Sequence, residues 1–128
     1  MLKTIATVFG AVMLAVGVLG FVPATTPDGM LFGVFQVNTA YNMIHLATGA
    51  VALWIGLASP QYARLYFQTF GVVYGLVALL GFFTQGDHIL GVIANNPADN
   101  WLHVAISGIA LAVGFGVKDE EATTVTRT

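Results

Sequence analysis

Two histidines are the only ionisable side chains in the middle of two long apolar stretches. His45 and His103 each lie three residues after an asparagine, Asn42 or Asn100, and Asp99 directly precedes the second asparagine. An imidazole can ligate a metal, exchange a proton near neutral pH, or donate and accept hydrogen bonds. Because an ionisable side chain is costly among apolar residues, these five residues form the candidate ligand or polar site of the chain.

The same residues belong to two polar stripes with helical spacing. Positions separated by four and then three residues lie on one face of an α-helix. The stripes consist of Asn38, Asn42 and His45 in one stretch and of Asn96, Asn100, His103 and Ser107 in the other. Asparagine is a favoured N-cap, so we expect Asn38 and Asn96 to cap their helices and the other members to face a common interior.

Equal spacing from the two caps leaves several kinds of chemistry open. Each histidine follows its cap by seven residues, or about 10 Å along a helix, so the two imidazoles are expected at the same depth. Such a pair could ligate haem b axially, form structural hydrogen bonds between helices, or bind a small ligand, a lipid headgroup or a proton. Another metal site would be poor, since only Asp99 and His88 lie near enough in sequence to complete its shell.

The composition excludes a water-soluble globular protein. Of the 128 residues, 57% are hydrophobic and only 8% are charged, and the mean hydropathy is +0.84. A net charge of −2 without a basic cluster argues against nucleic acid as a partner. The absence of cysteine excludes disulfides, thiolate metal sites and cysteine nucleophiles. No catalytic pattern of paired carboxylates, phosphate loop or Ser–His–Asp indicates an enzyme.

The few charged residues divide the chain into stretches that can span a membrane. Five charges up to residue 117 separate uncharged runs of 24, 35, 22, 11 and 18 residues. A membrane-crossing helix needs about 20 apolar residues, so four of these runs can each hold one. We predict helices near 4–22, 39–58, 64–84 and 98–117, followed by a polar cytoplasmic tail over 118–128. The connections 30–37 and 88–95 are too short to cross, and we expect each to form a short helix or turn at the outer interface.

Charges of opposite sign segregate to the two sides of the predicted bundle. The basic residues all fall on one side, and the acidic residues of the connections fall on the other. They are Lys3, Arg64, Lys118 and Arg127 against Asp28, Asp87 and Asp99. Because basic residues in short loops stay in the cytoplasm, both termini are predicted to be cytoplasmic.

An internal repeat relates the two halves of the chain. Residues 9–21 match residues 70–82 at seven of thirteen positions, and residues 31–57 match residues 89–115 at ten of twenty-seven. Apolar matches alone would be weak, but the second alignment also places two asparagines and one histidine in register. The period of about sixty residues corresponds to one helical hairpin per copy.

The repeat predicts an all-α membrane protein with a bundle of four transmembrane helices. It consists of tandem helical hairpins at about 4–58 and 64–117, related by a pseudo-two-fold axis along the membrane normal. Residues 1–24 have the composition of a signal peptide, but the first span belongs to the repeat, so we expect it to be retained.

Motifs around the two histidines resemble those of a known family. The stretches Asn42-Met43-Ile44-His45 and Asp99-Asn100-Trp101-Leu102-His103, with the segment Leu31-Phe32-Gly33-Val34-Phe35-Gln36, are similar to a bacterial family of small four-span membrane proteins defined as a domain of unknown function. The resemblance covers residues 4–117 and implies a bacterial inner (plasma) membrane location without implying an activity. The second copy carries Asp99 where the first carries Tyr41, so the two halves are not equivalent there.

These observations favour three functions of different classes. We expect first a non-enzymatic accessory or structural membrane protein with His45 and His103 inside the bundle. The alternative is a haem b protein for electron transfer or sensing, ligated by the two histidines, and the third is a small-solute or proton pathway. The expected partners are the lipid bilayer and either another membrane protein or a second copy of the chain.

Overall fold

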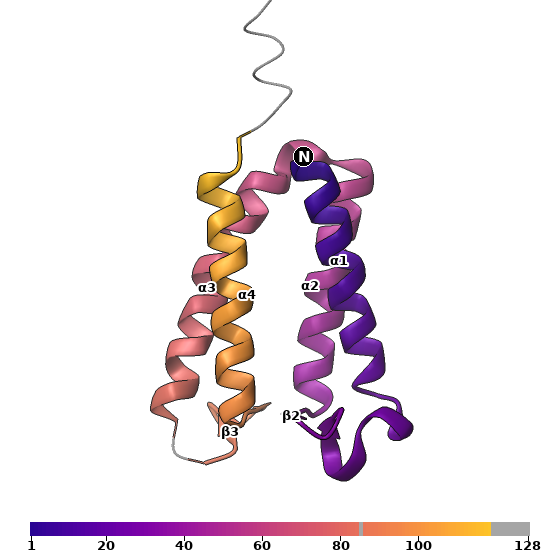
Figure 1. The fold of residues 1–128 in the computed structure, drawn as a ribbon, viewed down its shortest axis with the longest axis vertical. Helices are drawn as coiled ribbons and strands as arrows, with labels where there is room; N and C mark the ends of the chain where they lie inside the picture. Colours follow the sequence, from indigo (N-terminus) through magenta and orange to yellow (C-terminus); the bar gives the residue numbers. More distant parts are fainter. Residues whose placement is uncertain (85, 119–128) are drawn as a thin grey trace, which may run out of the picture.

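The structure, a computed structural model, consists of two helical hairpins placed side by side and describes residues 1–84 and 86–118 (Figure 1). α1 (Leu2–Leu19) and α2 (Thr39–Ala58) form the first helical hairpin. α3 (Ala63–Phe83) and α4 (Pro97–Gly116) form the second. From residue 119 onward, the predicted polar tail lies outside the described residues.

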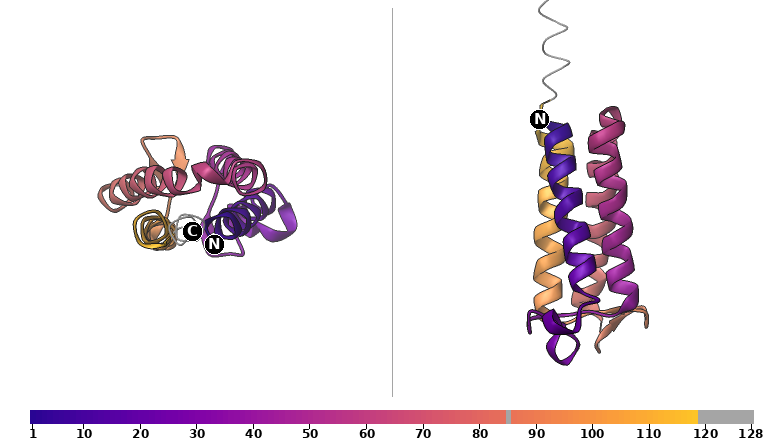
Figure 2. Two further views of the ribbon diagram at one scale, coloured as in Figure 1. Left: turned by 90° about the horizontal axis from the view of Figure 1, so that it is seen from above. Right: turned by 90° about the vertical axis from the view of Figure 1, so that its right-hand side faces the viewer.

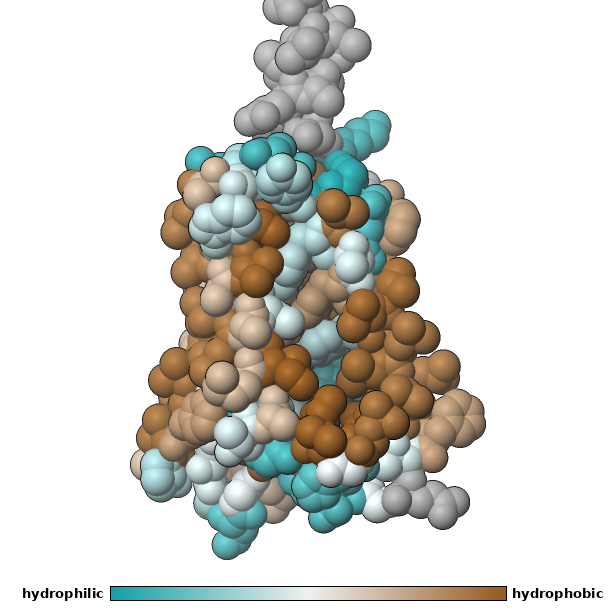
Figure 3. Space-filling model, turned by 180° about the vertical axis from the view of Figure 1, so that it is seen from behind, coloured by the Kyte–Doolittle hydropathy of each residue, from teal (hydrophilic) through white to brown (hydrophobic). Residues whose placement is uncertain are grey.

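All four of these helices are long and apolar enough to cross a membrane. The four candidate spans contain 18 to 24 residues, which at about 1.5 Å per residue matches a hydrocarbon thickness of about 30 Å. Figure 3 shows the consequence on the surface, where a broad apolar band lies between two more polar ends. The chain is therefore an all-α, multi-pass membrane protein, which confirms the predicted fold class.

Local sequence explains where the helices begin and end. α4 begins with a capping box, in which Asn96 Oδ1 accepts the Asp99 N–H at 2.9 Å and Asp99 Oδ2 accepts the Asn96 N–H at 3.1 Å. Pro97 fills the first helical position, where an N–H would have no helical partner. α1 ends at Leu19, short of the predicted limit at residue 22, because Pro23 holds the residue before it in an extended conformation.

The two longer connections form β-hairpins, so a short helix at these positions is wrong, whereas a turn does lie at each tip, over residues 32–34 and 90–92. β1 (Met30–Leu31) pairs antiparallel with β2 (Phe35–Gln36), and β3 (His88–Ile89) pairs antiparallel with β4 (Ile93–Ala94). The turns contain the left-handed pairs Phe32-Gly33 and Leu90-Gly91, with φ between 54° and 72°. Residues with positive φ reverse the chain tightly and match the twist of the flanking strands, so they close a β-hairpin. The first connection also contains two 3-10 turns, η1 (Pro23–Thr25) and η2 (Pro27–Gly29).

Each helical hairpin is packed closely through glycine. A Cβ atom on Gly10 of α1 would collide with the backbone of Leu53 in α2. A Cβ atom on Gly71 of α3 would lie 2.8 Å from the side chain of Leu111 in α4. These contacts occupy equivalent positions of the sequence repeat, and a second equivalent pair is Gly56 against Thr7 and Gly114 against Gln68. Glycine at these positions lets the helix backbones approach, and such close packing drives helix association in lipid.

The two helical hairpins meet through an aromatic cluster in the half of the bundle that holds the N-terminus. The Phe9 ring of α1 makes edge contacts with Tyr66, Phe67 and Phe70 of α3 at centroid distances of 5.3 to 6.3 Å. η3 (Pro60–Tyr62) joins α2 to α3 at this end, and both β-hairpins lie at the opposite end (Figure 1). We call the two ends of the bundle the terminal end and the hairpin end.

Candidate functional site

Both predicted histidines are buried inside the bundle. His45 is 1% exposed and His103 is 2% exposed. The Tyr41 ring stacks on His45 at 4.6 Å between centroids and lies 5.8 Å from the His103 ring. The Tyr74 ring lies 6.4 Å and 5.4 Å from the same two imidazoles. Two phenol rings therefore lie against both histidines in the interior of the bundle.

A hydrogen bond between Tyr41 and Asp99 joins the two helical hairpins at this level. The Tyr41 hydroxyl donates to Asp99 Oδ1 at 3.0 Å, and Asp99 Oδ2 accepts the backbone N–H of Asn96 in the capping box. Asp99 is 0% exposed. Each carboxyl oxygen has a donor, which offsets the cost of burying this group.

Residues at equivalent positions of the sequence repeat, which we call counterparts, contact each other at the centre of the bundle. Tyr41 bonds to Asp99, its own counterpart, and Phe9 lies 5.4 Å from Phe70, its counterpart near the terminal end. A residue that contacts its own counterpart lies at the axis that relates two copies. The contacts are those expected of hairpins related by a pseudo-two-fold axis. At the Tyr41 position the two copies differ in residue type, so that a donor meets an acceptor.

Hydrogen bonding fixes the tautomer of one histidine and leaves nitrogen atoms of both without a partner. His45 Nδ1 lies 3.1 Å from the Tyr41 carbonyl. Because a carbonyl only accepts, Nδ1 carries the proton, and the neutral ring presents a lone pair at Nε2. His45 Nε2 and His103 Nδ1 are buried with no hydrogen-bond partner among the described residues. Such atoms in a native core call for a bound water or a role in proton exchange.

A small cavity lies beside the two imidazoles. Its volume is about 30 Å³, room for about one water molecule. The lining residues come from both helical hairpins and are Tyr41, Ile44, His45, Tyr74, Val77, Ile93 and His103. Axial ligation by both histidines would need an open plane for the porphyrin between them, and the rings of Tyr41 and Tyr74 lie there. These residues do not fit haem b.

The two predicted asparagines lie within their own helical hairpins. Asn42 Nδ2 donates to the Gly20 carbonyl at 2.9 Å, which ties α2 to the end of α1. Asn100 packs against Gly81, the counterpart of Gly20, so closely that a Cβ atom on this glycine would collide with the amide. Both asparagines therefore join neighbouring helices near the hairpin end, as structural residues do.

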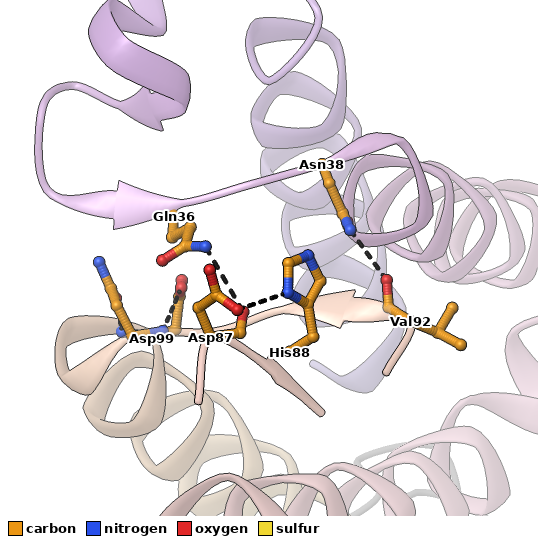
Figure 4. A network of polar contacts seen from close by, with 7 residues as sticks. Gln36, Asn38, Asp87, His88, Val92 and Asp99 are labelled. Atoms are coloured by element: carbon orange, nitrogen blue, oxygen red, sulfur yellow. Dashed lines mark hydrogen bonds and ion pairs between the residues drawn. The ribbon is translucent and has the colours of Figure 1, made fainter. Parts of the chain in front are cut away.

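Each N-cap asparagine also reaches across to the other half of the chain. Asn38 Oδ1 accepts the Tyr41 N–H at 2.9 Å and so caps α2, while Asn38 Nδ2 donates to the Val92 carbonyl at 2.8 Å (Figure 4). Asn96 Nδ2 makes the reciprocal bond to the Val34 carbonyl at 2.9 Å. Each β-hairpin is therefore held against the first turn of the capped helix in the other half.

Comparison with protein families assigns the chain to a known family. Residues 3–116 match the family described as a domain of unknown function, DUF4383. The chain belongs to the DUF4383 family. This result confirms the resemblance to a family of unknown function, and the match extends over the four helices, both β-hairpins and the buried cluster. No curated protein and no solved structure matches the chain.

Sequence reasoning missed two members of the buried cluster of this DUF4383 chain. In the sequence, only the alignment of the two copies distinguishes Tyr41, because this residue occupies the position at which the second copy has Asp99. Tyr74 lies in the apolar stretch of α3, and tyrosine in a membrane helix is also typical of the membrane interface. Neither signal predicts a residue packed against both histidines.

The third histidine of the DUF4383 chain lies outside the helices and pairs with an aspartate. His88 Nδ1 lies 2.8 Å from Asp87 Oδ1, and Gln36 Nε2 donates to the Asp87 carbonyl at 3.4 Å (Figure 4). The hydrogen bond from His88 holds the pKa of Asp87 below its ordinary value. Within residues 1–84 and 86–118, no group of three or more His, Asp or Glu side chains could hold a metal ion.

A larger hollow lies nearer the terminal end of the bundle, between α2 and α3. It has a volume of about 530 Å³ and opens on the face shown in Figure 3. Its apolar and aromatic lining consists of Trp54, Ile55, Tyr62, Leu65, Tyr66, Thr69, Phe70 and Val73. This hollow opens within the apolar band and shares no lining residue with the cavity beside the histidines.

Proposed function

We propose that the chain is a non-catalytic accessory or structural component of a bacterial inner membrane. The observation that carries this proposal is the hydrogen bond from Tyr41 to Asp99 at 3.0 Å. The buried carboxyl group has both of its oxygens engaged by donors of the chain itself. Hydrogen bonds of this group join two halves of the fold, which supports a structural role for it.

The packing around this bond supports a closed core. Beside the histidines, the cavity of about 30 Å³ has room for about one water molecule. Toward the terminal end, the Phe9 ring packs against Phe67 and Phe70 at 5.3 and 5.4 Å. A pathway for solutes needs a continuous polar or water-filled cavity. Aromatic packing next to the polar cluster favours a structural core over such a pathway.

An accessory component acts through contacts within the membrane. Its bundle presents an apolar outer surface, with exposed large hydrophobic side chains on all four described helices. The partner in this proposal is therefore another membrane protein or a second copy of the chain, embedded in the same bilayer.

The proposed orientation has both termini in the cytoplasm. Basic residues belong to the terminal end and acidic residues of the connections belong to the hairpin end. They are Lys3, Arg64 and Lys118 against Asp28 and Asp87. Arg64 also donates hydrogen bonds to the carbonyls of Gly114 and Val117, which fixes its charge at the end of α4. The retention of basic loops in the cytoplasm supports this orientation.

Cysteine labelling tests the orientation, because the chain has no cysteine of its own. In spheroplasts, Asp28→Cys is expected to react with a membrane-impermeant maleimide, whereas Lys118→Cys is expected to react only after the membrane is disrupted. Both positions are exposed, so differences in reactivity report the side of the membrane. The opposite labelling pattern would show that the termini lie outside.

Reconstitution tests the accessory function against its rivals. Vesicles that contain the protein and a trapped pH-sensitive dye are expected to lose an imposed pH gradient no faster than protein-free vesicles. The same preparation, expressed with ample haem precursor, is expected to lack a Soret band. A proton flux that disappears in His103→Leu and persists in the matched surface variant Val104→Leu would overturn the proposal, as would a Soret band that disappears in His45→Ala.

A second candidate function, a proton pathway, is favoured by the two unpartnered imidazole nitrogens. His45 Nε2 and His103 Nδ1 are buried, and both residues line the same small cavity. An ionisable group inside a bilayer commonly belongs to a proton relay. The flux measurement separates this candidate from the accessory function, because only a proton pathway produces transport that depends on the histidines.

A further inference from the structure

The tips of the two β-hairpins carry exposed apolar side chains. Phe32 is 59% exposed and Leu90 is 77% exposed, and Val34 and Val92 in the same turns are also exposed. The two pairs occupy equivalent positions of the sequence repeat. An exposed apolar cluster that occurs twice on one molecule indicates a surface that contacts something outside the chain.

The backbone at each tip strengthens this indication. Phe32 and Leu90 adopt the left-handed conformation, with φ of 55° and 54°. This conformation is unfavourable for a bulky residue with a Cβ atom, whereas glycine adopts it without strain. The structure thus holds a large apolar side chain outward in an unfavourable backbone conformation, and burial of that side chain does not offset the strain because the side chain is exposed.

The β-hairpins lie at the level where the transmembrane helices begin. β2 ends at Gln36 and α2 begins at Thr39, while β4 ends at Ala94 and α4 begins at Pro97. Figure 2 shows that the two β-hairpins project sideways from opposite faces of the bundle. Their tips therefore point away from the bundle axis, at the level where α2 and α4 begin.

Other exposed aromatic residues mark the same level. Trp101, in the second turn of α4, and Phe83, the last residue of α3, are both exposed at the hairpin end. Tryptophan and other aromatic rings at helix ends are typical of the membrane–water interface. The tips thus lie at the same end of the bundle as these interfacial residues.

We propose that the two tips, Phe32 with Val34 and Leu90 with Val92, are interfacial anchors that insert into the boundary between lipid headgroups and acyl chains. Their ligand is the surface of the bilayer that surrounds the bundle. Inside each β-hairpin, Leu31 or Ile89 is buried and holds the strand against the bundle.

The cap bonds connect these anchors to the buried core. Asn38 and Asn96 bond to carbonyls in the turns, at Val92 and Val34. Because each asparagine also caps a transmembrane helix, an anchored tip fixes the height of that helix in the membrane. The two anchors on opposite sides of the bundle thus limit its tilt.

Spin labelling of single cysteines tests the anchors in vesicles of phosphatidylethanolamine and phosphatidylglycerol. Collision rates with apolar oxygen and with a water-soluble nickel chelate report the depth of each label. For Phe32→Cys and Leu90→Cys, the ratio of oxygen to nickel collisions is expected to be several-fold above that of Asp28→Cys and below that of Val73→Cys. Asp28 is a matched aqueous control, because it is exposed in the same connection and has the same φ of 55°. Val73 is exposed on the apolar face of α3.

Two other outcomes would overturn the proposal. Tip labels with the collision ratio of Asp28→Cys would place the tips in water. Tip labels shielded from both reagents would indicate a protein contact, with a second copy or another membrane protein. Because cysteine at Phe32 or Leu90 can change a strained turn, Val34→Cys and Val92→Cys provide a second pair whose φ values are not positive. Loss of the oxygen preference in this pair as well would contradict the anchors independently of the strained positions.

Discussion

Replacing Tyr41 with phenylalanine is expected to lower the free energy of unfolding by about 1–2 kcal/mol. The substitution keeps the ring that packs on His45 and removes only the hydroxyl that donates to Asp99 Oδ1. Hydrogen bonds between membrane helices contribute about 0.6 kcal/mol on average. A larger value is expected here because the acceptor is a fully buried carboxyl oxygen that would be left without its donor. Unfolding in mixed micelles with increasing dodecyl sulfate, followed by circular dichroism, measures the change.

Tyr62→Phe is the matched control for this prediction. Tyr62 is 51% exposed at the terminal end, so loss of its hydroxyl is expected to leave the free energy of unfolding almost unchanged. If Tyr41→Phe unfolded at the same denaturant concentration as Tyr62→Phe, the bond between the helical hairpins would contribute nothing to stability.

A single added methyl group at Gly10 is expected to destabilise the protein by about 1–3 kcal/mol. The Cβ atom in Gly10→Ala would collide with the backbone of Leu53 and lie 2.8 Å from the Gly49 carbonyl oxygen. Backbone atoms cannot rotate away as the end of a side chain can. The substitution therefore has to separate α1 from α2, and the contact along both helices is reduced.

The chain supplies a control of opposite expected sign for this substitution. Gly108 lies within α4, and a Cβ atom added there would meet nothing within 4 Å. Gly108→Ala is expected to leave stability unchanged or to raise it by up to about 1 kcal/mol, because alanine favours the helix more than glycine does. Thermal unfolding of both variants in the same detergent gives the comparison. Equal melting temperatures for Gly10→Ala and Gly108→Ala would exclude close packing at Gly10 as a determinant of stability.

The fold of the membrane-spanning part could be predicted from sequence because one strong requirement governs it. Apolar helices must be long enough to cross the hydrocarbon, and charges such as Asp28 and Arg64 mark where they cannot continue. The β-hairpins escaped prediction because they depend on the conformation of two residues each. Phe32 and Leu90 have left-handed backbones that neither residue type favours, so the local sequence argued for a different turn.

The candidate site could be predicted only in part, for a related reason. Polar residues at helical spacing singled out His45 and His103, the motif of the second histidine added Asp99, and all three residues are buried. Tyr41 and Tyr74 escaped because a tyrosine in a membrane helix is as easily placed at the interface as in the core. Their position beside the histidines depends on contacts between the two helical hairpins, which spacing within one helix cannot reveal. These two rings are also what makes the haem hypothesis incompatible with the structure.

The central claim is that the hydrogen bond from Tyr41 to Asp99, at equivalent positions of the repeat, joins the two halves of the fold. Exchanging the residues at positions 41 and 99 tests this claim most directly. Tyr41→Asp alone places two carboxyl groups together, and Asp99→Tyr alone places two phenols there, so each single variant is expected to lose stability. In the double variant the carboxyl group again follows an N-cap, Asn38, by three residues, and the ring precedes a histidine, His103, by one turn. We predict that the double variant recovers stability relative to both single variants, with a coupling energy of about 1–3 kcal/mol in dodecyl sulfate unfolding. Additive losses in the double variant would contradict the claim.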